Sequence, residues 1–119
     1  MKFVHATISV RNMEESLKFY QEIVGLNMEK RFSGGSGVEI VFLGEGETKI
    51  ELIYNKNIQE INMAQDISLG FQVESLDKTM QFINEKDIQI HSGPFQPNPT
   101  TKFFYVLDPN GLKIQFIEY

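Results

Sequence analysis

The sequence begins with an alternating stretch, Phe-Val-His-Ala-Thr-Ile-Ser-Val at residues 3–10, and a similar stretch, Ile-Ser-Leu-Gly-Phe-Gln-Val, returns at residues 67–73. In the first stretch aliphatic side chains occupy every second position, and His5 lies among the more polar residues between them. A period of two is typical of a strand with one buried face. We therefore predict two strands, each with an aliphatic face packed on a helix and a more polar face turned away from it.

A capped helix is expected after each of these strands. Asn12 comes before the first helix, with Glu15 three residues further on, and Ser75 comes before the second. Asn and Ser are favoured N-caps because their side-chain oxygens accept hydrogen bonds from free backbone N–H groups. Apolar residues at helical spacing follow both caps. The first helix is predicted to end at Gly25 and the second near Glu85.

Short apolar runs bounded by turn-forming residues predict the remaining strands. In the first half of the chain these runs lie at roughly 26–33, 37–43 and 48–54, and in the second half at 87–91, 103–107 and 112–117. The last two runs are joined by Asp108-Pro109-Asn110-Gly111, whose residue types strongly favour a hairpin turn.

Two segments are predicted to lack regular structure. Residues 55–66 are mostly polar and are interpreted as a connector. The segment Ser92–Thr101 contains Pro94, Pro97 and Pro99, three of the four prolines of the chain. Because proline has no backbone N–H to donate, we expect this segment to be a loop.

The two halves of the chain align with each other as an internal repeat. A shift of 63 places Asn12 on Ser75, and a shift of 64 places Lys49–Ile53 on Lys113–Ile117. Each half then has the order strand, helix and three strands. We predict an α+β fold in which two βαβββ repeats, at about residues 1–60 and 61–119, form a curved mixed sheet around a cleft. Residues 1–119 are expected to be one domain.

The composition excludes several functional classes. The 119 residues are 41% hydrophobic and 23% charged, which is typical of one soluble globular domain. The absence of cysteine excludes a disulfide scaffold, a cysteine-ligated zinc site and a cysteine nucleophile. A net charge of −5 disfavours a nucleic-acid partner. There is no apolar run long enough to span a membrane, so we expect a cytoplasmic protein without membrane contact.

The repeat predicts where polar side chains gather. His5 in the first strand and Glu51 in the last strand of the first half have Ser68 and Gln115 as their counterparts. If the polar faces of the two halves line one cleft, these four side chains point inward. Nitrogen and oxygen ligands of this kind suit a divalent cation such as Zn, Ni, Mn or Fe. The alternatives are that His5 is a packing residue and that Glu51 faces solvent.

Several stretches together resemble the vicinal-oxygen-chelate superfamily, which includes glyoxalase I, bleomycin-resistance proteins, fosfomycin-resistance enzymes and extradiol dioxygenases. The resemblance covers essentially all 119 residues and is nearest to bacterial glyoxalase I. Its carriers are His5-Ala6-Thr7-Ile8-Ser9-Val10, Glu15-Ser16-Leu17-Lys18-Phe19-Tyr20, Val24-Gly25-Leu26, Lys49-Ile50-Glu51-Leu52, Gly93-Pro94 and Asp108-Pro109-Asn110-Gly111-Leu112-Lys113-Ile114-Gln115-Phe116.

The resemblance to glyoxalase I implies four metal-ligand positions, which fall on His5, Glu51, Ser68 and Gln115. His5 and Glu51 match the family pattern. Ser68 is not expected to be a ligand, because a hydroxyl is a poor ligand beside an imidazole. Gln115 can coordinate through its carbonyl oxygen but brings no charge. The implied metal ligands are therefore His5, Glu51 and Gln115, with lower affinity than the full family set.

The same resemblance points to a base and to substrate contacts. Gln115 cannot accept a proton at neutral pH, so Glu51 is the remaining candidate for a catalytic base. Arg11 is predicted to lie on the same face as Ser9, where glyoxalase I is expected to have a glutathione-binding arginine. Asn55 matches a position linked to glutathione contact.

Aromatic residues of the second half offer a different kind of site. Phe103 and Tyr105 are compatible with a bound cationic, aromatic ligand, as the resemblance to bleomycin-resistance proteins implies, and their alternative role is core packing. Extradiol dioxygenases fit less well, because Ser68 and Gln115 leave their triad of two His and one carboxylate incomplete. Fosfomycin-resistance enzymes fit less well, because Gln115 replaces the last-strand Glu on which they rely.

Two hypotheses follow for the function. The first is a metal-assisted lyase or isomerase that acts on a small oxygen-rich molecule, such as the thiol adduct of a 2-oxoaldehyde. The alternative is a metal-free protein that sequesters a small organic molecule. Both hypotheses involve a small-molecule ligand and no organic cofactor. A homodimer is expected in either case, because a domain of this size buries a limited share of its surface by itself.

Overall fold

The computed structural model describes residues 1–58 and 60–119 and divides them into two compact units, Met1–Asn62 and Met63–Tyr119. Gln59, within the predicted connector 55–66, lies outside the described residues. Within the described part of the chain, no helix has the length and apolar character needed to cross a bilayer. That residues 1–119 act as one domain stays a prediction.

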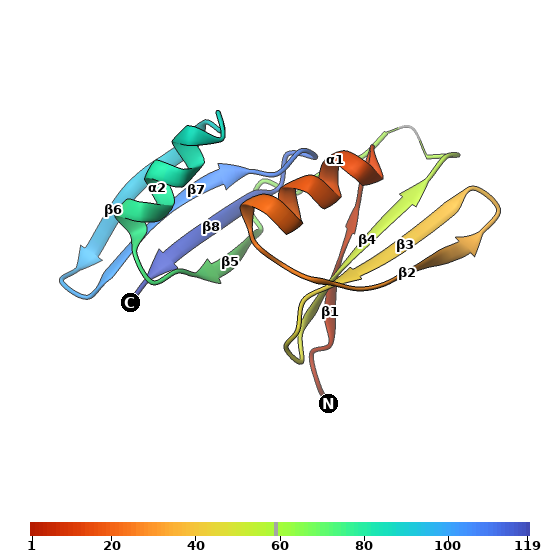
Figure 1. Ribbon diagram of the computed structural model, residues 1–119, viewed down its shortest axis with the longest axis horizontal. Helices are drawn as coiled ribbons and strands as arrows, with labels where there is room; N and C mark the ends of the chain where they lie inside the picture. Colours follow the sequence, from red (N-terminus) through yellow and green to blue (C-terminus); the bar gives the residue numbers. More distant parts are fainter. Residues whose placement is uncertain (59) are drawn as a thin grey trace. The chain divides into compact units, whose positions relative to one another are not determined.

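The first unit is a four-stranded mixed sheet with one helical segment. Its elements are β1 (His5–Ser9), α1 (Met13–Lys18), η1 (Phe19–Ile23), β2 (Met28–Gly35), β3 (Val38–Leu43) and β4 (Lys49–Asn55). The strand order is β1-β4-β3-β2, with β1 parallel to β4 and the other neighbours antiparallel (Figure 1). The last strand of the unit therefore lies inside the sheet.

The second unit repeats this arrangement. Its elements are β5 (Ser68–Gln72), α2 (Leu76–Glu85), β6 (Ile90–Asn98), β7 (Thr101–Leu107) and β8 (Lys113–Glu118). The strand order β5-β8-β7-β6 again pairs the first strand with the last in parallel. In Figure 1, α2 lies across this second sheet. The predicted α+β architecture of two βαβββ repeats is confirmed.

The repeat extends to single hydrogen bonds. Val10 N donates to Ile53 O at 2.9 Å, and Val73 N donates to Ile117 O at 2.8 Å. These two bonds are related by the shifts of 63 and 64 residues that align the two halves of the sequence. The backbones of the two units are thus equivalent at the end of the pairing between the first strand and the last strand of each unit.

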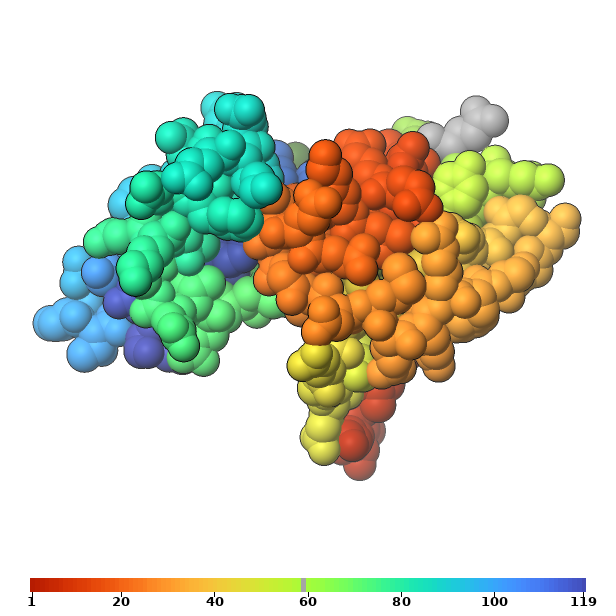
Figure 2. All heavy atoms as spheres, in the orientation of Figure 1, coloured from red at the N-terminus to blue at the C-terminus, as the bar shows by residue number. Residues whose placement is uncertain are grey.

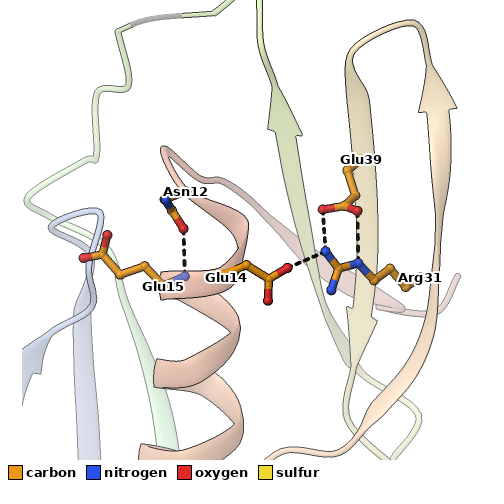
Figure 3. Close-up of polar contacts among 5 residues, drawn as sticks. All are labelled: Asn12, Glu14, Glu15, Arg31 and Glu39. Carbon is orange, nitrogen blue, oxygen red and sulfur yellow. Dashed lines mark hydrogen bonds and ion pairs between the residues drawn. The ribbon is translucent and has the colours of Figure 1, made fainter.

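Local side-chain chemistry starts both helices where the sequence predicts. Asn12 Oδ1 accepts a hydrogen bond from Glu15 N at 2.9 Å (Figure 3), and Ser75 Oγ accepts one from Lys78 N at 3.3 Å. The first helix continues beyond α1 as the π-helical turn η1, and Gly25 ends it with φ of +85°. Glycine suits this left-handed conformation because it has no Cβ.

The helix-covered face of each sheet carries the buried side chains. In the first unit Ile8, Val41 and Leu52 alternate along their strands with more exposed residues, and in the second unit Phe104, Ile114 and Phe116 do the same. Because strand side chains alternate in direction, the residues between them belong to the opposite face. That opposite face carries the polar residues singled out in the sequence.

An ion-pair cluster joins α1 to the hairpin of β2 and β3 on the helix-covered side (Figure 3). Arg31 Nη2 lies 2.6 Å from Glu14 Oε1, and the Arg31 guanidinium contacts both carboxylate oxygens of Glu39 at 3.0 Å. The hydrogen bonds to Glu39 and Glu14 raise the pKa of Arg31 above its ordinary value. Both acidic partners therefore neutralise this arginine.

The prediction of a loop at Ser92–Thr101 is wrong. Residues Ile90–Asn98 form β6, and the expected short strand at 87–91 begins only at Ile90. β6 is an edge strand, and its pairing with β7 shifts register between Ser92 and Phe95 and again before Asn98. Prolines are tolerated there because an edge strand needs partners on one side only.

Candidate functional site

Four residues of the first unit form one row across the sheet, on the face opposite α1. Thr7 of β1 pairs with Glu51 of β4, Glu51 pairs with Phe42 of β3, and Phe42 pairs with Lys30 of β2. We call these residues, Thr7, Glu51, Phe42 and Lys30, the first row. Neighbouring strands lie about 4.8 Å apart, so the row places groups of different chemistry at regular intervals.

Glu51 and His5 face each other on adjacent strands of this face. His5 Nε2 lies 3.6 Å from Glu51 Oε1, and Thr7 Oγ1 donates a hydrogen bond to the same oxygen at 2.6 Å. The Glu51 side chain is only 14% exposed, whereas that of His5 is 36% exposed. The hydroxyl and the imidazole offset the cost of burying the carboxylate. Both of these contacts use Oε1, and among the described residues Oε2 has no such partner and can meet a ligand.

Aromatic rings and a lysine complete the polar face of the first unit. The His5 ring meets Phe42 edge to face at 5.5 Å, and Phe32 stacks on Phe42 at 6.2 Å. Lys30 Nζ lies 4.7 Å from the centre of the Phe42 ring and 5.7 Å from that of Phe32. Phe32, Phe42 and Lys30 were not predicted from the sequence. Alternation along β2 and β3 assigns them to a face only once the register of the hairpin is known.

The other basic residue of this face is paired. Lys49 Nζ contacts Glu29 Oε2 at 2.7 Å and donates to Gly44 O at 2.7 Å. The hydrogen bond from Lys49 lowers the pKa of Glu29 below its ordinary value. Lys49 is therefore neutralised within the protein.

The two predicted substrate contacts of the first unit lie near its connector. Arg11 follows the end of β1, and its Nη2 donates to Ile61 O at 3.3 Å. Asn55 ends β4 and uses its Oδ1 to accept a hydrogen bond from Asn57 N at 2.9 Å. Asn55 also lines a cavity of about 50 Å³ together with Ser9, Val10, Ile53, Ile58 and Ile61. Their substrate-binding role stays a prediction.

The second unit has an equivalent row with neutral side chains. Gly70 of β5 pairs with Gln115 of β8, Gln115 pairs with Tyr105 of β7, and Tyr105 pairs with Ser92 of β6. We call these residues, Gly70, Gln115, Tyr105 and Ser92, the second row. Gln115 Nε2 donates to the Tyr105 hydroxyl at 3.2 Å. Ser68 is exposed at the start of β5, two residues before the row.

Tyr105 belongs to an aromatic cluster on this face. Its ring lies 5.8 Å from Phe103 and 6.4 Å from Phe95, and Lys113 Nζ lies 5.7 Å from its centre. Phe95 is 44% exposed, whereas Phe104, the residue between Phe103 and Tyr105, is fully buried on the helix side. The predicted pair Phe103 and Tyr105 therefore shares an accessible face instead of the core.

His5 and Glu51 of the first unit together fit one divalent cation, to which the protein would supply two ligands. Two ligands on a tetrahedral zinc ion lie about 3.4 Å apart, close to the 3.6 Å between His5 Nε2 and Glu51 Oε1. One imidazole and one carboxylate leave the other positions to water or substrate. Among residues 1–58 and 60–119 there is no cluster of three or more His, Asp or Glu side chains suited to a metal. Ser68 and Gln115, in the second unit, add no charge.

A comparison with protein families agrees with this fold. The family model described as Glyoxalase/Bleomycin resistance protein/Dioxygenase superfamily matches residues 2–116. The chain belongs to this superfamily. The resemblance found in the sequence is thereby confirmed, and the match covers both βαβββ repeats.

Two of the relatives are named as lactoylglutathione lyases, one of them as a probable one. The lactoylglutathione lyase of Neisseria meningitidis is 26% identical over 126 residues, which cover 99% of this chain and 91% of the relative. A probable lactoylglutathione lyase of Synechocystis is 30% identical over 128 residues, which cover 99% of this chain and 95% of the relative.

A solved structure supports the superfamily fold at lower identity. The trypanothione-dependent glyoxalase I of Leishmania major has a TM-score of 0.85 and 22% identity, with 99% of this chain and 86% of that chain covered. This likeness shows the fold alone.

Proposed function

We propose that this superfamily member is a glyoxalase-type enzyme that isomerises the thiol adduct of a 2-oxoaldehyde into a thioester. The observation that carries the proposal is the His5–Glu51 pair, with 3.6 Å between Nε2 and Oε1 and a Glu51 side chain that is only 14% exposed. The names of the relatives from Neisseria meningitidis and Synechocystis support the same reaction class.

Glu51 is the proposed base. In the adduct, the carbon that bears sulfur and hydroxyl loses its hydrogen as a proton, and the neighbouring ketone carbon gains a proton. A second proton leaves the hydroxyl oxygen, and the ketone oxygen takes one up, so the atoms balance. The first carbon thereby becomes the thioester carbonyl and the second becomes an alcohol carbon, with no external oxidant. Glu51 Oε2 can take and return this proton, whereas the amide of Gln115 cannot. Thr7 holds the carboxylate in place through Oε1.

His5 and Glu51 would also hold a divalent cation. Such an ion, when bound, supplies Lewis-acid polarisation of the substrate oxygens. The predicted ion is Zn, Ni, Mn or Fe. Gln115 also stays a predicted ligand. The proposal also includes a homodimer and a cytoplasmic location, which were expected from the sequence.

The test is the rate of thioester formation from adducts of methylglyoxal with several thiols. The untagged protein is first stripped with a chelator and then supplied with Zn, Ni, Mn or Fe(II). We expect turnover to disappear on chelation and to return with at least one metal. No turnover with any metal and any thiol, together with no micromolar metal binding in calorimetry, would contradict the proposal.

A second candidate function rests on the second unit. Its neutral row and the cluster of Phe95, Phe103 and Tyr105 favour metal-free binding of a planar aromatic molecule. Thermal shift measurements in excess chelator, with cationic aromatic antibiotics as probes, test this alternative. We expect stabilisation that is lost in the Phe95→Ala variant, and equal shifts in both proteins would exclude the site.

A further inference from the structure

Lys30 differs from the other two basic side chains of β2 and β4. Arg31 contacts Glu14 and Glu39, and Lys49 contacts Glu29. Within residues 1–58 and 60–119, Lys30 makes no ion pair, and its ammonium lies instead over the rings of Phe42 and Phe32. Lys30 also attracts the neighbouring Glu29 carboxylate at longer range, but that carboxylate is bound directly by Lys49. The ammonium of Lys30 is therefore held in place without a direct carboxylate contact.

The two rings fix where this charge lies. Phe42 and Phe32 are stacked with only 11° between their planes, and the ammonium lies closer to Phe42. A cation over an aromatic face loses little of its capacity to donate hydrogen bonds, because the ring accepts no full N–H bond. The exposed side of the ammonium is left to meet an anion. Lys30 is exposed in β2, on the face opposite the α1 side that Figure 2 shows.

The register relates Lys30 to the proposed base. Glu51, Phe42 and Lys30 pair in sequence across β4, β3 and β2, so Lys30 lies two strands away from Glu51 on the same face. Two strand spacings amount to roughly 10 Å. A ligand that reaches from one to the other passes over the Phe42 ring.

We infer that Lys30 is an anion-recognising, specificity-determining residue of the face that carries Glu51, and that it selects substrates whose thiol part bears a carboxylate. This inference rests on the proposed function. A carboxylate fits better than a phosphate ester, because a single ammonium matches a single negative charge. Phosphate sites usually combine several donors, and the net charge of −5 repels polyanions.

The test measures binding without turnover. The probe is S-hexylglutathione, an unreactive thioether with free carboxylates, and the comparison ligand is its dimethyl ester, which lacks both carboxylate charges. Calorimetric titration of the wild-type protein is expected to show tighter binding of the acid. In Lys30→Met the affinity for the acid falls roughly fivefold to twentyfold, as expected for a partly exposed charge-assisted contact, while the ester is unaffected.

Two variants control this measurement. Lys18→Met removes the same charge from α1, on the other side of the sheet, and should leave the affinities for both ligands unchanged. Lys30→Arg keeps a cation that also stacks on aromatic rings, and it should restore most of the preference for the acid. The preference should also decrease as the salt concentration rises.

The outcomes separate this inference from the proposed function. Equal affinities for the acid in the wild-type protein and in Lys30→Met, or no binding of the acid by the wild-type protein, overturn the role of Lys30. If thiol adducts are isomerised in either case, the proposed reaction still stands. If the acid binds through Lys30 but no adduct is isomerised, the anion site stands and the proposed reaction is wrong.

Discussion

In the first row Glu51 lies between the hydroxyl of Thr7 and the ring of Phe42, and in the second row Gln115 lies between the bare backbone of Gly70 and the ring of Tyr105. The carboxylate of Glu51 accepts a hydrogen bond from Thr7, whereas the amide of Gln115 donates one to Tyr105. The two rows therefore match in position and differ in charge.

This difference shows which positions have the same kind of side chain in both repeats of the sheet and which do not. Leu52 and Phe116, which follow the two central residues, are both apolar and buried because each packs under a helix. Side chains on the opposite face do not pack under a helix and need not be apolar. Glu51 and Gln115 can therefore differ without disturbing the core. The charged side chains Glu51 and Lys30 therefore lie in the first row, and the second row offers an amide, hydroxyl groups and aromatic surface.

The Glu51→Gln variant makes the centre of the first row like that of the second, and it should have the largest effect. We expect the rate of thioester formation to fall by about 100-fold or more, since general-base catalysis usually contributes 10²–10⁴. Stability in urea should change little, because Thr7 can still donate to an amide oxygen. Glu22→Gln, an exposed carboxylate of η1, serves as the control. Retention of more than a tenth of the activity would exclude Glu51 as the base.

The Thr7→Val variant removes the donor that distinguishes the first row from Gly70 of the second. We expect a loss of about 1 kcal/mol in the free energy of unfolding, because the bond is short but exposed. Urea denaturation measures this loss, and Ser9→Ala on the same strand is the control. In the double variant with Glu51→Gln, the two effects should not add. Strict additivity would show that the hydroxyl and the carboxylate are not coupled.

The reverse change, Gly70→Thr, introduces a hydroxyl into the second row. A Cβ at Gly70 would lie 3.0 Å from Gln115 Oε1, so the amide must shift by a few tenths of an ångström. We expect a stability change below about 1 kcal/mol, since the close atom is the end of a flexible side chain. NMR chemical shifts of the Gln115 side-chain amide should change. Gly70→Ala adds the Cβ alone, and an unperturbed amide in both variants would contradict the predicted contact.

The smallest expected effect concerns Lys49 and Lys113, which lie two residues before Glu51 and Gln115 in the two units. Lys49 lowers the pKa of Glu29 below its ordinary value of 4.5. The stability from this pair is present above that value and is lost as the pH falls through the lowered pKa. In Lys49→Met, an NMR titration should show the pKa of Glu29 rising back toward 4.5. Lys113→Met, the equivalent change in the second unit, should leave the Glu29 titration unchanged.

Features set by local chemistry could be predicted from the sequence. The caps at Asn12 and Ser75 depend on residues three positions apart. The turn after β7 depends on Asp108, whose Oδ1 accepts hydrogen bonds from Asn110 N at 2.8 Å and Leu112 N at 2.9 Å. Alternation alone also placed His5 and Glu51 on the polar faces of their strands.

Features set by strand register or by position in the sheet could not be predicted. Lys30 lies opposite Phe42 only because β2 shifts its register between Met28 and Lys30. β6 was missed because the sequence does not show that this proline-rich strand lies at a sheet edge. Alternation predicted the face of Arg11, but β1 ends at Ser9, so the alternation no longer applies there.

The central position of the last strand in each sheet has a consequence for synthesis of the chain. β4 and β8 are the last strands of their units to leave the ribosome, yet each lies between the first strand and a hairpin strand. Neither sheet can close before its final strand emerges, and such long-range pairing is a slow step of folding. A premature stop codon just before Lys113 would remove β8, leaving β5 without its strand partner and β7 as an open edge prone to aggregation.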